Sequence, residues 1–132
     1  MKFKKILILL IISFSLNAYS SYSGVYYCSD NDVNGFSPIK DFKRTGFKGS
    51  KFKAKIDYEN QEVYSSEFFL DTRGGLVECK VNKYSSILCI SNFGRSFSFN
   101  PVSRYFVRSS HFADDKKPED SITVGYGICE KF

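Results

Sequence analysis

Four cysteines, Cys28, Cys79, Cys89 and Cys129, follow an N-terminal segment that has the features of an export signal. An exported chain folds in an oxidising compartment, where cysteines usually pair as disulfides instead of serving as nucleophiles or metal ligands. Four cysteines allow three pairings. This feature constrains the fold more than any other, because each pairing fixes which segments lie side by side.

The N-terminal segment combines a basic start, an apolar run over residues 6–14 and a small-x-small triplet. The basic residues are Lys2, Lys4 and Lys5, and the triplet is Ala18-Tyr19-Ser20. This order is typical of a cleavable signal peptide, and the apolar run is about half of the roughly 20 residues that cross a bilayer. We therefore predict a signal peptide over 1–20 and a single secreted or periplasmic domain over 21–132, with no transmembrane segment after cleavage.

The net charge of the whole chain is +5, but much of it belongs to the leader. Removing three lysines from the 19 basic residues leaves 16 against 14 acidic ones, a net charge of +2. A nearly neutral exported domain is not expected to bind nucleic acid.

Alternation with a period of two residues is the main secondary-structure signal. Residues 51–58 are the clearest case, with Phe52, Ala54, Ile56 and Tyr58 on one face and Lys51, Lys53, Lys55 and Asp57 on the other. The chain also has 14 Phe and nine Tyr, which suit pleated surfaces. The sequence predicts an all-β fold, a small antiparallel meander barrel or sandwich of about eight strands.

The expected strands follow one another with short turns between them. They are 22–28, 51–58, 63–70, 76–81, 86–91, 96–99, 104–109 and 121–129. In the last one, hydropathy places Ile122, Val124, Tyr126 and Ile128 on the buried face and leaves Gly125 and Gly127 on the other face.

The position of the cysteines selects one pairing. Cys79 and Cys89 lie symmetrically about a predicted hairpin turn at 82–85, so they face each other across adjacent strands. Cys28 then pairs with Cys129 and joins the first strand to the last. Redox or zinc chemistry is disfavoured, because there is no Cys-x-x-Cys and the single histidine is far from every cysteine in the sequence.

One acidic segment has the spacing of an EF-hand-type calcium loop. Asp30, Asp32, Asn34 and Asp41 fall at loop positions 1, 3, 5 and 12, and Gly35 falls at position 6. The segment therefore predicts a calcium site. The alternative is an Asx-rich turn that leaves the first strand.

The segment from Lys40 to Lys55 contains seven cations and only Asp41 as an acid, a local charge of +6, with Phe42, Phe47 and Phe52 interleaved. Lys51, Lys53 and Lys55 alternate with apolar residues and share one strand face. In an exported protein such a segment favours anionic glycans, lipid headgroups or an acidic protein surface of the cell envelope. The alternative is a solvated face whose lysines prevent edge-to-edge aggregation.

The search for catalytic residues yields little. His111 is near Asp114 and Asp115 in the sequence, but no Gly-x-Ser-x-Gly or other marked nucleophile is present. We expect a monomeric binding module without catalytic activity.

Tyr26-Tyr27-Cys28, Cys129 and Ser103-Arg104-Tyr105 together resemble features of the small exported lysozyme inhibitors of bacteria. That family consists of antiparallel β-barrels with an inhibitory Ser-Gly-x-x-Tyr loop, whose glycine is absent here. The resemblance implies a glycosidase inhibitor in which Ser103 and Tyr105 are the contact residues. A carrier of small apolar ligands, using an aromatic barrel interior, is a further alternative.

Overall fold

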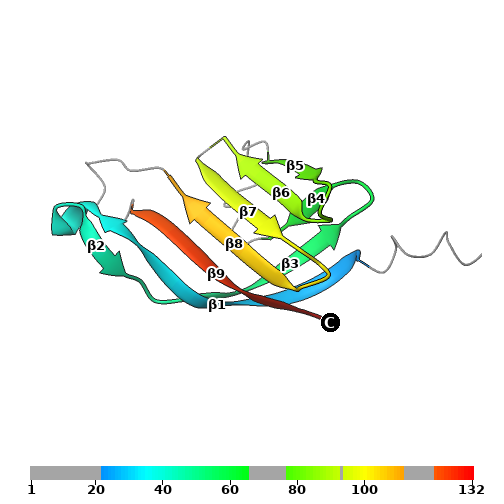
Figure 1. The fold of residues 1–132 in the computed structure, drawn as a ribbon, viewed down its shortest axis with the longest axis horizontal. Helices are drawn as coiled ribbons and strands as arrows, with labels where there is room; N and C mark the ends of the chain where they lie inside the picture. Colours follow the sequence, from blue (N-terminus) through cyan, green and yellow to red (C-terminus); the bar gives the residue numbers. More distant parts are fainter. Residues whose placement is uncertain (1–21, 66–76, 93, 112–120) are drawn as a thin grey trace, which may run out of the picture.

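The computed structural model describes residues 22–65, 77–92, 94–111 and 121–132, and these are almost entirely β-structure (Figure 1). The predicted leader lies outside the described residues, as do residues 66–70 of the predicted strand 63–70 and residue 76 of the predicted strand 76–81. The strands are β1 (Gly24–Ser37), β2 (Lys43–Gly46), β3 (Lys51–Asp57), β4 (Glu62–Tyr64), β5 (Val77–Val81), β6 (Ile87–Ser91), β7 (Arg95–Phe99), β8 (Tyr105–Ser110) and β9 (Ile122–Lys131). A 3-10 turn, η1 (Pro38–Lys40), separates β1 from β2.

All strands belong to one antiparallel sheet with the order β4-β3-β1-β9-β8-β7-β6-β5, and β2 pairs with the outer part of β1. The sheet curls into a nearly closed barrel, whose end strands β4 and β5 lie close together (Figure 1). Near this gap, the Val81 N–H donates a hydrogen bond of 2.8 Å to Oε1 of Gln61. The predicted antiparallel all-β barrel is confirmed.

Aromatic rings fill the described part of the interior. The centroid of Phe97 lies 5.8 Å from that of Phe106 and 6.1 Å from that of Phe52, and all three side chains are buried. The Phe97–Phe106 pair is stacked and the Phe52–Phe97 pair is edge-to-face, and aromatic pairs in these arrangements contribute about 0.5–1.5 kcal/mol each beyond their buried area. The alternation predicted for β3 is confirmed, because Phe52, Ala54 and Ile56 face this core.

Two disulfides join neighbouring strands at directly paired positions. Cys28 on β1 bonds to Cys129 on β9, and Cys79 on β5 bonds to Cys89 on β6, with 4.0 Å between the Cα atoms of each pair. The backbone N–H of Cys129 donates to the carbonyl of Arg104, on the side away from β1. Cys28 and Cys129 therefore form a non-hydrogen-bonded pair, the closer of the two antiparallel pair types. The predicted pairing is confirmed.

The face predicted for the last strand is wrong. Gly125, Gly127 and Cys129 point inward on β9, whereas Val124 and Tyr126 are half exposed on the outer face. Cys129 determines this orientation, because its disulfide lies inside the barrel and residues two apart share a face. Hydropathy alone gave the opposite orientation.

β1 is twice as long as predicted and continues through the segment expected to be a loop. Its register with β9 shifts between Asp30 and Asp32, which marks a β-bulge. Beyond the bulge, β1 pairs with β9 on one side and β2 on the other, and the hairpin extends to one end of the molecule (Figure 1). The described residues contain no helix long and apolar enough to span a bilayer.

Candidate anion-binding surface

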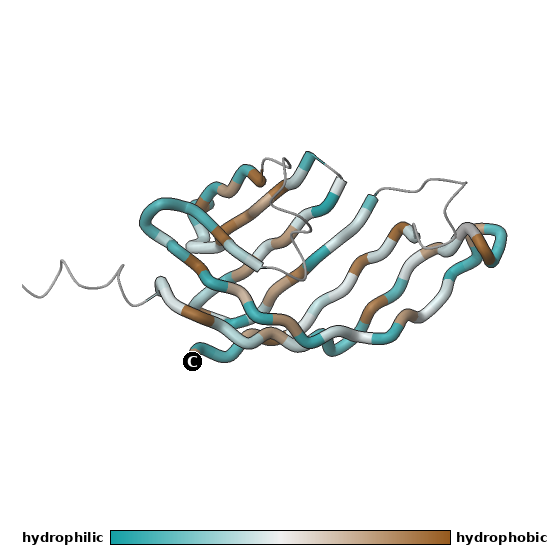
Figure 2. Tube along the Cα trace, turned by 180° about the vertical axis from the view of Figure 1, so that it is seen from behind, coloured by the Kyte–Doolittle hydropathy of each residue, from teal (hydrophilic) through white to brown (hydrophobic). Residues whose placement is uncertain are grey.

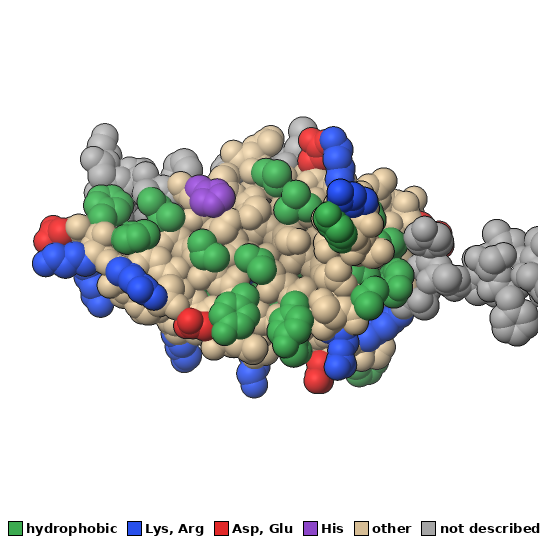
Figure 3. All heavy atoms as spheres, in the orientation of Figure 1, with side chains coloured by type: hydrophobic (Ala, Val, Ile, Leu, Met, Phe, Trp, Pro, Cys, Tyr) green, Lys and Arg blue, Asp and Glu red, His purple; other side chains and the backbone are tan. Residues whose placement is uncertain are grey.

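The seven cations of the basic stretch lie on β2, on β3 and on the segments beside them, and all seven are exposed. They are Lys40, Lys43, Arg44, Lys48, Lys51, Lys53 and Lys55. Figure 3 shows Lys and Arg side chains along the end and the lower edge of the molecule, where Figure 1 places β2, β1 and β3. The connection between β2 and β3 is short, so the two groups of cations belong to one continuous run of chain.

The three lysines of β3 share its outer face, as the alternation predicts. Residues two apart on a strand are separated by about 6–7 Å, so their charges act on the same extended ligand. Their partners in register on β1 are Ser29, Tyr27 and Val25, none of which is acidic. The Nζ of Lys53 also lies 6.0 Å from the centroid of the Tyr27 ring.

No ion pair joins these cations to an acid within the part of the chain that the structure describes, and Asp57 interacts with Lys55 only at longer range. The ion pairs found there join Lys80 to Glu78 and Arg108 to Asp30, and neither involves the basic stretch. The stretch therefore presents charge that is available to a ligand.

The turn between β1 and β2 has an unusual backbone conformation at two consecutive residues. Asp41 and Phe42 have φ angles of +53° and +55°, a left-handed conformation that glycine and asparagine adopt more readily. Two consecutive non-glycine residues there cost about 1–2 kcal/mol each. The turn is closed by a hydrogen bond of 3.0 Å from the Phe42 N–H to the Ser37 carbonyl. A shallow depression beside it is lined by Lys40, Asp41, Lys43, Arg44, Thr45 and Gly46.

The sequence prediction for this turn covered its cations and Phe42 but missed Phe36 and Ile39. Phe36, Ile39 and Phe42 are 45%, 69% and 46% exposed. Figure 2 shows hydrophobic residues at this end of the chain trace, beside hydrophilic ones. The sequence signal that could have identified them is the presence of three large apolar residues around Pro38, because the side chains of such a turn usually face the solvent.

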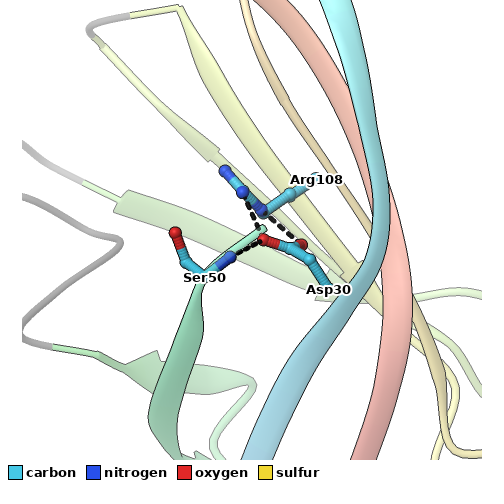
Figure 4. Close-up of polar contacts among 3 residues, drawn as sticks. All are labelled: Asp30, Ser50 and Arg108. Carbon is cyan, nitrogen blue, oxygen red and sulfur yellow. Dashed lines mark hydrogen bonds and ion pairs between the residues drawn. The ribbon is translucent and has the colours of Figure 1, made fainter. Parts of the chain in front are cut away.

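The predicted calcium loop does not form. Asp30 and Asp32 lie within strand β1, and the Asp30 side chain is fully buried. It accepts hydrogen bonds of 2.8 Å from Nε of Arg108 and from the N–H of Ser50, and an ion pair to Arg108 completes the contact (Figure 4). Asp32 instead accepts a bond of 2.7 Å from the Asn34 side chain. No cluster of three or more His, Cys, Asp or Glu suited to a metal occurs among the described residues.

The contact between Asp30 and Arg108 crosses strand β9, which separates β1 from β8. Gly125 of β9 lies beside this contact, and a Cβ atom there would lie 3.1 Å from a methyl of Val33, a tight approach, and 3.4 Å from Oδ1 of Asp30. Gly127 is tighter still, since a Cβ atom would lie 2.0 Å from the Ser29 carbonyl oxygen. The acidic residue is therefore a structural anchor at the bulge.

A serine–histidine contact lies on the outer face of β8. Oγ of Ser109 is 3.1 Å from Nε2 of His111 and 2.6 Å from Oγ of Ser96. Ser109 is only 9% exposed, and its hydroxyl is already engaged with Ser96. These contacts give the nearly buried Ser109 hydroxyl its hydrogen-bond partners. Asp114 and Asp115, which the sequence places near His111, lie outside the described residues.

Ser103 and Tyr105 are both exposed at the turn between β7 and β8. Asn100 organises this turn, because its Oδ1 accepts hydrogen bonds of 2.9 and 3.0 Å from the N–H groups of Val102 and Ser103. Arg104 has a φ of +65°. The Tyr105 side chain is 53% exposed and points outward from β8.

Three ionisable side chains have pKa values shifted by their surroundings. The hydrogen bond from the Asn60 side chain lowers the pKa of Asp57, and burial raises the pKa of Tyr26. The hydrogen bond from Tyr64 to Glu62 raises the pKa of Tyr64. Lys55 of the basic stretch adds a smaller electrostatic contribution to the lowered pKa of Asp57.

Comparisons with known proteins do not identify a family for this chain. No protein-family model matches the chain, and no curated protein matches it.

Proposed function

We propose that this protein is an exported, non-catalytic binding module that recognises an anionic surface through residues 40–55. The observation that carries the proposal is the exposure of all seven cations of this segment, with no ion pair to a described acid. The two disulfides support an oxidising compartment, which agrees with the leader expected from the sequence.

The arrangement of the cations determines the expected kind of binding. Exposed charges are screened over about 8 Å at physiological ionic strength, so each contributes little alone. Several cations spaced by about 6–7 Å along one strand reinforce one another only on a ligand with repeated negative charges. The binding is therefore of moderate strength and decreases steeply with salt.

The test is retention on an immobilised sulfated glycan across a salt gradient, with protein that begins at residue 21 and keeps every described strand. The variant Lys51→Ala/Lys53→Ala/Lys55→Ala is expected to elute at clearly lower salt than the wild type. The matched control Lys80→Ala/Lys83→Ala/Arg104→Ala removes the same charge from exposed positions outside the basic stretch, on β5 and on two turns. Equal effects of the two variants would show a net-charge effect only and would overturn the proposal.

A second candidate function is inhibition of a lysozyme-type glycosidase through Ser103 and Tyr105. The observation that favours it is the backbone of Arg104, which follows Ser103 at the position of the family's loop glycine and adopts a left-handed φ of +65°. Inhibition of lysozyme turnover at molar excess of the protein, lost in Tyr105→Ala but not in the control Tyr84→Ala, is the expected result. Uninhibited turnover would exclude this candidate.

A further inference from the structure

The turn between β1 and β2 gathers large apolar side chains that the core does not use. We call Phe36 to Arg44 the hairpin tip. Phe36, Ile39 and Phe42 are each at least 45% exposed, within seven consecutive residues. Single exposed apolar residues are ordinary, but a group of them bordered by polar residues marks an interaction site.

The same tip carries cations beside these apolar groups. Phe36 and Arg44 are opposite each other in the pairing of β1 with β2, so their side chains lie on one face. Lys40, Lys43 and Arg44 line the shallow depression, which is open to the solvent. Figure 3 shows hydrophobic and basic side chains next to one another at the end of the molecule where Figure 1 draws β2.

The backbone of the tip is another independent observation. Phe42 is a bulky residue in a left-handed conformation, and its neighbour Asp41 has the same conformation. Glycine or asparagine would form this turn with less strain, so the turn itself does not require a phenylalanine. Strain of this kind persists at sites where a side chain is held for a purpose other than folding.

We propose that the hairpin tip docks onto anionic lipid bilayers, with its cations at the headgroup phosphates and Phe36, Ile39 and Phe42 in the interfacial layer. This inference rests on the proposed function and assigns the lipid surface as its partner. Cations alone would suit any polyanion, whereas the most exposed apolar side chain of the tip, the aliphatic Ile39, gains little from a hydrated, sulfated glycan. A bilayer surface accepts both, because amphipathic elements bind there through apolar burial and attraction to anionic lipids together.

The primary experiment is co-sedimentation with two kinds of vesicle, phosphatidylcholine alone and phosphatidylcholine mixed with phosphatidylglycerol, using protein from residue 21 onward. We expect binding to the mixed vesicles only. The variant Ile39→Ser/Phe42→Asn should bind them at least about tenfold more weakly while its retention on sulfated glycan is unchanged. The matched control Leu88→Ser/Ile90→Ser, which removes exposed apolar groups from β6, should bind like the wild type.

A matched pair of charge variants tests which cations contact the lipid. Lys40→Gln/Lys43→Gln/Arg44→Gln and Lys51→Gln/Lys53→Gln/Lys55→Gln each remove three positive charges. The tip variant should lose more vesicle binding than the β3 variant. The opposite order, or vesicle binding that does not respond to either the apolar or the charged tip variant, overturns the inference.

A fluorescence measurement detects insertion directly, because the chain contains no tryptophan. Phe42→Trp introduces one reporter at the tip, and Tyr84→Trp introduces one at an exposed position of the turn between β5 and β6. Mixed vesicles should shift the Phe42→Trp emission to shorter wavelength, and lipids brominated on the acyl chain should quench it, with neither effect for Tyr84→Trp. Retention on glycan without vesicle binding would overturn this inference alone, whereas loss of both would overturn the proposed function as well.

Discussion

The two halves of β1 have opposite relations to the rest of the molecule. The first half, before the bulge at Asp30, lies between β3 and β9 and buries Tyr26 and Cys28. The second half, after the bulge, lies between β9 and β2, exposes Phe36 and leads into the strained turn. One strand of 14 residues, about 45 Å long, thus belongs to the barrel at one end and to a projecting hairpin at the other.

This contrast separates residues that hold the fold from residues available for binding. Changes around the first half remove buried contacts and covalent links, so they should reduce the free energy of unfolding. Changes in the second half remove exposed groups and should leave stability nearly unchanged while they affect binding.

The largest effect is expected for Cys28→Ser/Cys129→Ser. The disulfide closes a loop with a sequence separation of 101, and its removal should lower the free energy of unfolding by about 4–5 kcal/mol. Removal of the Cys79–Cys89 link, with a separation of 10, should cost somewhat under 3 kcal/mol by the same relation. Urea unfolding of both double variants measures the difference, and a larger loss for the shorter loop would contradict the loop-entropy account.

The junction between the two halves is tested by Arg108→Met. This change leaves the fully buried Asp30 carboxylate without its cation, which typically costs about 3–5 kcal/mol. The double variant Asp30→Leu/Arg108→Met should recover much of the loss, because no buried charge remains unpaired. Denaturant unfolding monitored by circular dichroism compares the two variants. A double variant that is no more stable than Arg108→Met would show that the unpaired Asp30 charge is not the cause of the lost stability.

The second half of β1 is tested by Phe42→Asn. Asparagine tolerates the left-handed conformation, so stability should be unchanged or rise by up to about 1 kcal/mol. The melting temperature of this variant is compared with that of the control Phe97→Ala, for which the loss of a buried ring should cost about 3–5 kcal/mol. A marked loss of stability in Phe42→Asn would assign Phe42 to the fold and weaken the separation of the two halves.

The strands of the barrel were predictable from the sequence, and the second half of β1 was not. Alternation along β3 and the symmetry of Cys79 and Cys89 are local signals, and both gave the observed arrangement. Asp30 and Asp32 read as loop residues, because polar residues at these spacings usually leave a strand. A partner distant in the sequence explains the buried position of Asp30, because Arg108, 78 residues away, neutralises its charge. Asp32 is exposed and accepts a hydrogen bond from the nearby Asn34.

The candidate surface was predictable to a similar extent. The cations of residues 40–55 could be counted directly, and the exposed face of β3 followed from its period of two. The exposure of the apolar residues of the hairpin tip could not be predicted in this way, because it depends on which side of the turn faces the core. The face of β9 failed for a related reason, since the inward position of Cys129 outweighs the hydropathy of Val124 and Tyr126.

The smallest effect concerns Asp57, at the end of β3 in the barrel region. Its carboxylate accepts hydrogen bonds of 2.9 Å from the Asn60 side chain and 3.0 Å from the Asn60 N–H, and these contacts lower its pKa. A lowered folded-state pKa contributes stability above the unfolded-state value of about 3.9, and the contribution is lost as the pH falls through the folded-state pKa. Asn60→Ala removes the side-chain donor but keeps the backbone donor, so the pKa of Asp57 should rise part of the way to its ordinary value. NMR titration of the Asp57 carboxyl carbon in the wild type and in Asn60→Ala measures the shift, with Lys40→Ala, beyond the opposite end of β1, as a control that leaves it unchanged. Because Asn60→Ala removes no charge and lies at the opposite end of β1 from the hairpin tip, vesicle and glycan binding should be the same in Asn60→Ala and the wild type.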